Sequence, residues 1–220
     1  MALEVYWGSG SPFSWRVLLT LEVKRLPYES KLLEFSKAEH KSPDYLKLNP
    51  RGKVPALKDG GFVLYESLAI MAYLDRKHPE PPLFGRTAQE SGLIWRVISE
   101  TESYLVPAGN KLIAPIFFAK GLEKTEEIQA AAATIRGELK RIDASLVGSV
   151  WLVGSSISAA DIALFPLIQL LLRAASKDAA TPFNLGFSPL GQHYPNIAAW
   201  VKRVEAIPDY DRTYPPHWRQ

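Results

Sequence analysis

A proline-rich segment, His78-Pro-Glu-Pro-Pro-Leu-Phe-Gly85, divides the chain into two halves with different hydrophobic patterns. Closely spaced prolines followed by a glycine are typical of a linker, because proline neither continues a helix nor donates to a strand ladder. Before this segment, short strand-like runs alternate with helical ones, and after it the pattern is almost wholly helical. The 220 residues suffice for two modest domains. We therefore expect domains at residues 1–80 and 88–220.

The hydrophobic pattern and turn signals of the first half predict the element order βαβαββα, which makes this domain α+β. Asp59-Gly60-Gly61 is a strong hairpin-turn signal between its last two strands. Pro12 suits the first position of a helix, where its missing N–H would be unpaired in any case, and Ser11 then lies at the N-cap. We expect strands at 3–7, 28–33, 54–58 and 62–65, and helices from Pro12 to about Val23, at 42–48 and at 67–77.

The second half predicts an all-α helical bundle with helices at about 88–119, 124–147, 158–174 and 195–206. Pro107 and Gly109 predict a bend or break in the first of these helices. Ser158 and Asp161 form a capping-box pattern before an apolar run, so we interpret Asp161 as structural.

Composition excludes several function classes. The chain has no cysteine, hence no disulfide framework and no thiolate nucleophile of its own. Its four histidines lack metal-binding spacing, so no metal is expected. The net charge of +3 is scattered, which argues against nucleic acid as a partner. We find no secretory signal and no apolar run of about 18 residues, so we expect no membrane association and a cytoplasmic location.

Four motifs, in this order and at these separations, resemble those of the soluble, two-domain glutathione transferases. They are Ser11-Pro-Phe-Ser-Trp-Arg-Val17, Leu48-Asn-Pro-Arg-Gly-Lys-Val-Pro-Ala-Leu57, Glu66-Ser-Leu-Ala-Ile70 and Gly154-Ser-Ser-Ile-Ser-Ala-Ala-Asp161. The resemblance covers essentially the whole chain. It implies a thioredoxin-like glutathione-binding domain over 1–80 and a helical domain over 88–220 that contributes to the electrophile site.

The first motif is similar to the serine-type classes. Its Ser-Pro-Phe triplet resembles the tau class and bacterial relatives, whereas Ser-Trp-Arg-Val resembles the zeta class. Zeta-type isomerases normally have serine at the position of Pro12 and cysteine at that of Phe13. This chain departs at both positions, which counts against maleylacetoacetate-type isomerase activity.

The resemblance implies that Ser11 activates the thiol of glutathione, the expected co-substrate. A serine in this role donates a hydrogen bond to the thiolate and does not attack, so it needs no histidine or aspartate partner. The alternative for Ser11 is a plain helix cap. Ser9 and Ser14 are neighbouring rivals, and Tyr6 is a further one, because some classes use a tyrosine near the end of the first strand.

Further residues are implied to hold glutathione. The Val54–Pro55 bond is expected to be cis, leaving the main chain of Val54 to pair with the cysteinyl backbone. Ser67 and the helix N-terminus suit the γ-glutamyl carboxylate, and Glu66 the ammonium group. Lys53 and Lys41, or His40 beside it, could meet the glycyl carboxylate.

The electrophile pocket is expected near Pro12 and Phe13 and along the first long helix of the second half, with Tyr104, Pro107, Lys111 and Phe118 as candidates. We expect a detoxifying transferase that attacks small apolar electrophiles or organic hydroperoxides and forms a homodimer. One alternative is a glutathione-dependent lyase, dehalogenase or isomerase on the same fold. Another is a non-catalytic ligand-binding or interaction module.

Overall fold

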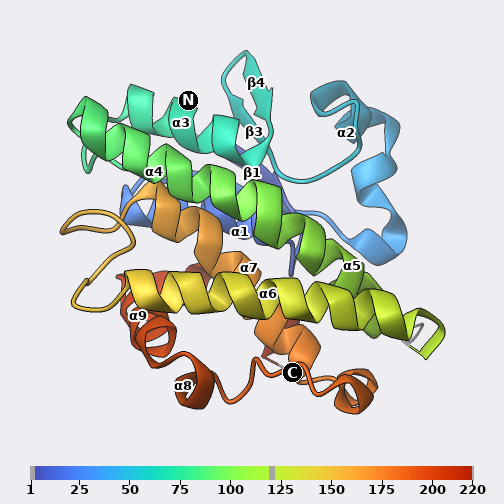
Figure 1. Ribbon diagram of the computed structural model, residues 1–220. Coiled ribbons are helices and arrows are strands. Elements are labelled where there is room, and N and C mark those ends of the chain that lie inside the picture. Colours follow the sequence, from blue (N-terminus) through green and yellow to red (C-terminus); the bar gives the residue numbers. More distant parts are fainter. Residues whose placement is uncertain (1–2, 119–121, 220) are drawn as a thin grey trace. The chain divides into compact units, whose positions relative to one another are not determined.

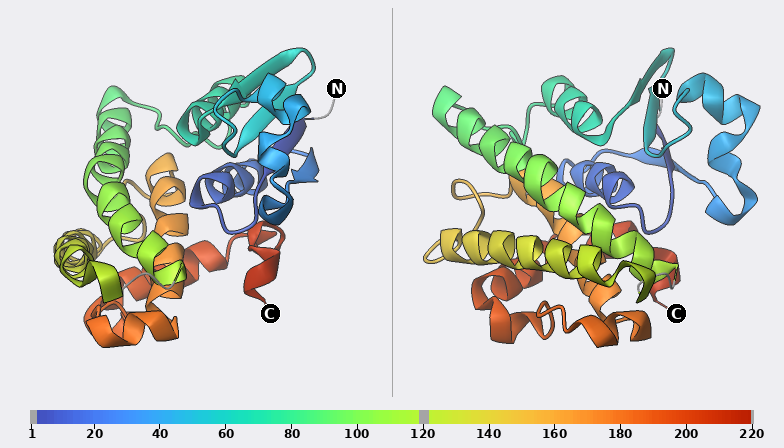
Figure 2. Two further views of the ribbon diagram at one scale, coloured as in Figure 1. Left: turned by 90° about the vertical axis from the view of Figure 1, so that its right-hand side faces the viewer. Right: turned by 45° about the vertical axis from the view of Figure 1, so that its right-hand side comes forward.

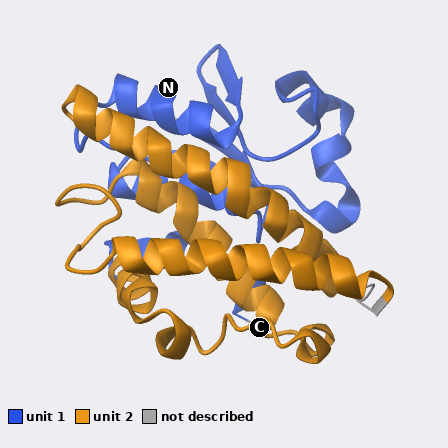
Figure 3. Ribbon diagram, viewed as in Figure 1, with its two compact units in different colours: residues 1–84, 206–220 blue, residues 85–205 orange. Residues whose placement is uncertain are grey.

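The computed structural model describes residues 3–118 and 122–219, which divide into two compact units (Figure 3). Unit 1 comprises residues 1–84 together with 206–220, and unit 2 comprises 85–205. The C-terminal residues thus belong with the first unit, whereas the sequence assigned them to a second domain over 88–220. The reason is aromatic packing, because Trp15 lies against Tyr210, Tyr214 and Trp218.

Unit 1 is built on a four-stranded mixed sheet in the order β2-β1-β3-β4 (Figure 1). Strand β1 pairs in parallel with β2 and antiparallel with β3, and β3 forms an antiparallel hairpin with β4. The strands are β1 (Leu3–Trp7), β2 (Tyr28–Leu32), β3 (Ala56–Asp59) and β4 (Phe62–Tyr65). The helices are α1 (Pro12–Val23), α2 (Pro43–Leu48), α3 (Ser67–Lys77) and α10 (Tyr210–Thr213), with short 3-10 turns at Phe35–Lys37, Glu39–Lys41 and Pro216–Trp218. The βαβαββα order and the thioredoxin-like fold class are confirmed.

Alternation along β1 decides which face of the sheet is buried. Leu3, Val5 and Trp7 pack with α1 and α3 in the core of unit 1, alongside Leu57 of β3. Tyr6 lies on the other face, where its ring centroid is 6.0 Å from that of Tyr45 in α2. Strand β3 begins at Ala56, two residues later than the sequence predicted, because Pro55 has no N–H to donate to a ladder.

Unit 2 is helical, and α6 runs beside α5 in both views of Figure 2. Its helices are α4 (Ala88–Glu100), α5 (Val106–Phe117), α6 (Thr125–Ser145), α7 (Ala159–Ala175), α8 (Leu190–His193) and α9 (Pro195–Glu205), with short 3-10 turns at Leu122–Lys124 and Asp178–Phe183. The helix expected over 88–119 is interrupted by a π-helical turn, η3 (Thr101–Leu105), and its last predicted residue lies outside the described residues. This turn precedes Pro107, which lacks the N–H that a regular helix would bond to residue 103.

The predicted capping box at the start of α7 is present. Asp161 accepts hydrogen bonds from the Ser158 backbone N–H and hydroxyl, each at 2.9 Å, from the Leu152 N–H at 3.0 Å and from the Trp200 indole at 2.8 Å. Burial raises the pKa of this carboxyl, while the four donors act in the opposite direction. Through these hydrogen bonds Asp161 connects α7 to α9 and to the loop that contains Leu152. No helix of the described residues is long and apolar enough to cross a membrane.

Candidate active site

Ser11 is the N-cap of α1, and its hydroxyl is available as a donor. Its Oγ accepts a hydrogen bond from the Ser14 N–H at 3.2 Å, which fixes the side chain at the helix N-terminus. Within the described residues no acceptor takes the hydroxyl proton of Ser11, and the side chain is half-buried. A group that accepts from the helix and still has a proton to give can bind an anion placed at the positive end of α1.

The neighbouring serines are differently placed. Ser14 is fully buried, and its Oγ accepts the Gly8 N–H at 3.3 Å. The Ser9 hydroxyl lies 2.5 Å from Nδ1 of His217. Both side chains therefore support the loop that leads into α1.

Tyr6, the alternative to Ser11, has an acceptor for its hydroxyl proton within unit 1. Its hydroxyl donates to the Glu4 carboxylate at 2.9 Å, and burial together with that bond raises the pKa of Tyr6 to about 12. The Lys58 ammonium, 2.7 Å from Glu4, and the Tyr6 hydroxyl lower the pKa of the Glu4 carboxyl. The Tyr6 hydroxyl thus already donates its hydrogen bond to the ionised Glu4 carboxylate, on the face of the sheet opposite α1 and α3.

The Val54–Pro55 bond is cis, as predicted. Neither the N–H nor the C=O of Val54 has a hydrogen-bond partner among the described residues, so both can pair with an extended ligand. The carbonyl of the preceding Lys53 accepts from the Tyr45 hydroxyl at 2.6 Å and from the Asn49 side chain at 2.7 Å. These two donors hold the turn that presents Val54.

Tyr45 and Asn49 are positioning residues that sequence reasoning missed. Asn49 is buried, and its side-chain oxygen also accepts the Arg51 N–H at 3.0 Å, which closes an Asx turn. The Asn-Pro-Arg-Gly spacing carried a signal for that turn. Nothing in the sequence indicated that Tyr45, three residues into a short helix, would reach the carbonyl of Lys53.

Glu66 and Ser67 lie together at the start of α3. Glu66 is the N-cap residue with a φ of 74°, a backbone conformation that costs a non-glycine residue about 1 kcal/mol or more. Its exposed carboxylate lies 3.8 Å from the Arg51 guanidinium. Ser67 is buried at the first turn of the helix. A strained cap residue next to a free helix N-terminus is typical of a ligand site.

The lysines expected near the glycyl carboxylate flank the same turn. The Lys41 ammonium donates to the Gly52 carbonyl at 2.8 Å, and the Lys53 side chain is exposed. His40 lies beside them, with its backbone carbonyl close to Gly52 and its ring edge-on to Phe35 at 5.1 Å. The Lys41 ammonium thus contacts the residue that directly precedes Lys53.

The residues predicted for the electrophile pocket fall in both units. Pro12 and Phe13 are half-buried in the first turn of α1, and the Arg16 guanidinium lies 5.0 Å from the Phe13 ring centre. In unit 2, Tyr104, Pro107 and Lys111 line one cavity of about 450 Å³ between α5 and α6. Phe118 is 74% exposed at the end of α5 and does not line that cavity.

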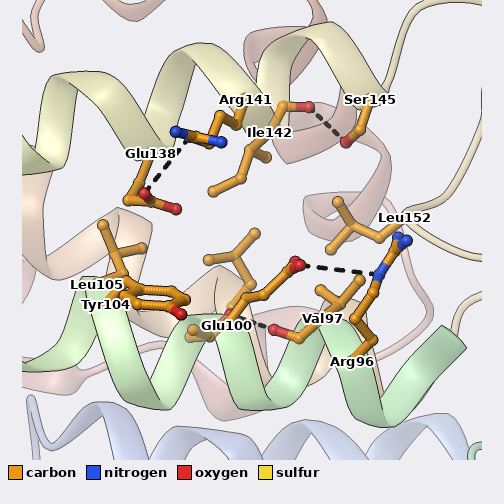
Figure 4. Close-up of a pocket in the computed structure, with 12 residues that line it drawn as sticks. Arg96, Val97, Glu100, Tyr104, Leu105, Glu138, Arg141, Ile142, Ser145 and Leu152 are labelled. Carbon is orange, nitrogen blue, oxygen red and sulfur yellow. Dashed lines mark hydrogen bonds and ion pairs between the residues drawn. The ribbon is translucent and has the colours of Figure 1, made fainter. Parts of the chain in front are cut away.

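A second cavity in unit 2, of about 640 Å³, has a charged lining (Figure 4). Arg96 and Glu100 project from α4, and Glu138 and Arg141 project from α6 on the opposite side. Each helix pairs its own charges, at 3.8 Å and 3.7 Å respectively. Apolar side chains such as Leu105 and Ile142 complete the lining, together with Tyr104, one of the predicted electrophile-pocket residues. Among the described residues no cluster of three or more histidine or acidic side chains could hold a metal.

Comparison with known proteins shows the family. The model of the glutathione S-transferase N-terminal domain matches residues 10–77, and that of the C-terminal domain matches residues 102–208. The chain belongs to the glutathione S-transferase family. It is therefore a transferase whose family uses glutathione, and its N-terminal match contains Ser11, Val54, Glu66 and Ser67.

Individual relatives match this chain over nearly its whole length. Glutathione S-transferase A of Pleuronectes platessa is 30% identical, and the match covers 98% of this chain and 92% of that protein. A maleylacetoacetate isomerase of Dictyostelium discoideum is 28% identical over 97% of this chain and 92% of its own length. The crystal structure of a glutathione S-transferase from the Antarctic clam Laternula elliptica has a TM-score of 0.82 and 30% identity, covering 100% of this chain and 95% of the other.

Proposed function

We propose that this glutathione transferase binds glutathione on unit 1 and activates its thiol through the hydroxyl of Ser11. The observation that carries this proposal is the state of that hydroxyl, which accepts the Ser14 N–H and has no acceptor for its own proton among the described residues. A free thiol has a pKa of about 8.5, and lowering it by about two units takes about 2.7 kcal/mol of preferential stabilisation of the anion. The hydroxyl and the N-terminus of α1 would supply it together.

The remaining groups would hold the tripeptide in register. The free N–H and C=O of Val54 pair with the cysteinyl backbone as an added strand would. Ser67 and the N-terminus of α3 bind the γ-glutamyl carboxylate, and Glu66 accepts from the γ-glutamyl ammonium. Lys41 and Lys53 attract the glycyl carboxylate. Each end of the ligand thus meets a group of opposite charge.

The second substrate would be a small apolar electrophile or an organic hydroperoxide, since thiolate attack serves both. In unit 1, Pro12 and Phe13 are the proposed contacts of this substrate. In unit 2, Tyr104, Pro107 and Lys111 line a candidate pocket, and Phe118 does not line it. A cytoplasmic homodimer with a detoxifying role is part of the proposal. A panel of electrophiles, hydroperoxides and maleylacetoacetate-type substrates with glutathione tests the chemistry, and sedimentation equilibrium tests the dimer.

The role of Ser11 is tested by the ultraviolet band of bound glutathione thiolate. We expect wild type to show the band at neutral pH, and Ser11→Ala to lose about three quarters or more of it with a similar fall in kcat, because one charge-assisted hydrogen bond contributes about 1.5–3 kcal/mol. Ser11→Thr should retain most of it. A wild type with no band would contradict the whole proposal, and a band lost in Tyr6→Phe but kept in Ser11→Ala would move the role to Tyr6.

Loss of the helix cap needs its own control, because Ser11→Ala also removes an N-cap worth about 1 kcal/mol. Thr87 is the N-cap of α4 in unit 2, and its side chain accepts the Glu90 N–H at 3.1 Å. Thr87→Ala should lower the free energy of unfolding by a similar amount and leave the thiolate band unchanged.

A further inference from the structure

The C-terminal segment, residues 206–220, returns to unit 1 and contacts the loop that leads into Ser11. Nδ1 of His217 lies 2.5 Å from the Ser9 hydroxyl, with the direction of the hydrogen bond set by the imidazole tautomer. The next loop residue, Gly10, has a φ of 80°. A Cβ built on Gly10 would lie 2.7 Å from Cε1 of His217 and 3.2 Å from Nε1 of Trp218. The tail therefore packs directly on this loop.

The same segment is anchored to the first turns of α1. The Trp15 indole donates to the Thr213 hydroxyl at 2.8 Å, and its ring meets those of Tyr214 and Trp218 edge-on at 5.6 and 5.5 Å. Trp15 follows Ser11 by one helical turn, and the backbone N–H of Trp15 donates to the Ser11 carbonyl at 3.0 Å. The tail thus holds the chain both before and after Ser11.

The Gly8–Ser11 loop contains two glycines and an internal backbone hydrogen bond. Gly8 and Gly10 give its backbone wide conformational freedom, and the Ser11 N–H closes a turn onto the Gly8 carbonyl at 3.1 Å. A hydroxyl that donates to a thiolate must lie within about 2.6–3.2 Å of it, so small movements of this loop matter to the chemistry. The Ser9–His217 contact is a polar link between the tail and this loop.

We propose that His217 is a positioning residue for Ser11, acting through Ser9 to hold the Gly8–Ser11 loop where the Ser11 hydroxyl meets the glutathione sulfur. This inference rests on the proposed role of Ser11. It extends the active site to the chain's last residues, which the sequence did not implicate. Neither Ser9 nor His217 contacts the ends of glutathione in the proposed arrangement. Replacing either residue should therefore weaken activation of the thiol and leave the affinity for glutathione nearly unchanged.

The test is a pH titration of the thiolate band of bound glutathione in His217→Ala, Ser9→Ala and the double variant. We expect each single variant to raise the apparent pKa of the bound thiol by about one unit, a tenfold loss of thiolate below that pKa. The KM for glutathione should change less than about twofold while kcat falls. The double variant should equal the single ones, because both remove the same contact. His217→Asn keeps a nitrogen or oxygen near the position of Nδ1, so the thiol pKa in this variant should stay close to that of wild type.

Two controls separate positioning from general packing of the tail. Arg219 bonds the Asp211 carbonyl at 2.6 Å within the tail, so Arg219→Ala should leave the thiol pKa unchanged. Equal shifts in His217→Ala, His217→Asn and Arg219→Ala would overturn the proposal, as would an unshifted titration in both His217→Ala and Ser9→Ala. Should His217→Ala fail to fold, Ser9→Ala with His217→Asn decides the matter. Absence of any band in wild type would instead contradict the proposed function itself.

Discussion

Asp161 is the residue whose replacement we expect to cost the most stability in unit 2. Its carboxylate is 0% exposed and accepts from four donors, so Asp161→Ala leaves those donors unsatisfied in the core. We expect a loss of about 3–5 kcal/mol in the free energy of unfolding, measured by urea denaturation. Asp161→Asn should cost less, because it keeps the oxygen that accepts from Leu152 and Trp200.

Trp200→Phe is the matched control, since it removes one donor and keeps the carboxylate, at an expected cost of about 1 kcal/mol. Equal losses for Trp200→Phe and Asp161→Ala would show that the indole bond, and not the capping box, carries the stability. A loss below about 1 kcal/mol in Asp161→Ala would contradict the structural role.

Single residues were predictable from sequence where the signal was local. The Ser158–Asp161 capping box and the Ser11 N-cap each depend on residues three apart, and both are present. Partners distant in sequence were not predictable, because nothing local encodes them. Trp200 reaches Asp161 across 39 positions and His217 reaches Ser9 across 208. The candidate site was therefore identified through its motifs, and its supporting contacts came from the structure.

At the scale of elements, Asp59 connects the β3–β4 hairpin to α3. Its carboxylate accepts from the Tyr73 hydroxyl at 2.7 Å and from the Lys77 ammonium, and these bonds lower the pKa of Asp59. A lowered pKa means that the folded state binds fewer protons than the unfolded chain, so this stabilisation is present above pH about 4 and is lost as the pH falls through the folded-state pKa. Asp59→Asn should narrow the difference in stability between neutral and acidic pH.

The measurement is thermal unfolding of wild type and Asp59→Asn from pH 7 downward, with the difference between the two curves as the readout, since other carboxylates titrate in both. At neutral pH we expect a difference of less than about 1 kcal/mol, because Lys77 is solvent-exposed. Asp44→Asn is the control, as its partner Lys47 lies within the same short helix and joins no second element. If the difference in stability between wild type and Asp59→Asn grew toward acidic pH, the stabilising role of the ionised Asp59 carboxylate would be contradicted.

Regular elements followed from periodicity, and irregular ones did not. The helix over Ser67–Lys77 was predicted with its exact bounds, because its apolar spacing and its start and end signals agree. Proline and glycine near 107–109 correctly signalled an irregularity, but the chain places it one turn earlier as a π-helical turn, since the missing N–H of Pro107 affects the carbonyls that precede it. The short 3-10 turns around Phe35 and His40 have no periodicity to read.

At the scale of the whole molecule, unit 1 is completed by residues from both ends of the chain. Trp15 is 2% exposed because the last residues cover it, and its indole N–H bonds Thr213 across 198 positions. The Arg212 guanidinium also lies 3.2 Å from the buried carboxylate of Glu22, whose pKa is raised by burial. The segment that follows unit 2 in sequence therefore supplies core contacts to unit 1.

A chain that ends at Glu205 should retain unit 2 and lose stability in unit 1. Removing the tail exposes the Trp15 ring and leaves its indole N–H and the Glu22 carboxylate without these partners, which we expect to cost about 3 kcal/mol or more. Trp7, which lies in the core of unit 1, is then solvated before the buried Trp200 of unit 2, so urea unfolding followed by tryptophan fluorescence should show a separate early transition. Thr213→Val in the full chain should reproduce a smaller part of the loss, about 1–2 kcal/mol, because it removes the acceptor and keeps the aromatic packing. A single transition at the wild-type midpoint in the shortened chain would contradict this account, since unit 1 would then be complete without the residues that close it.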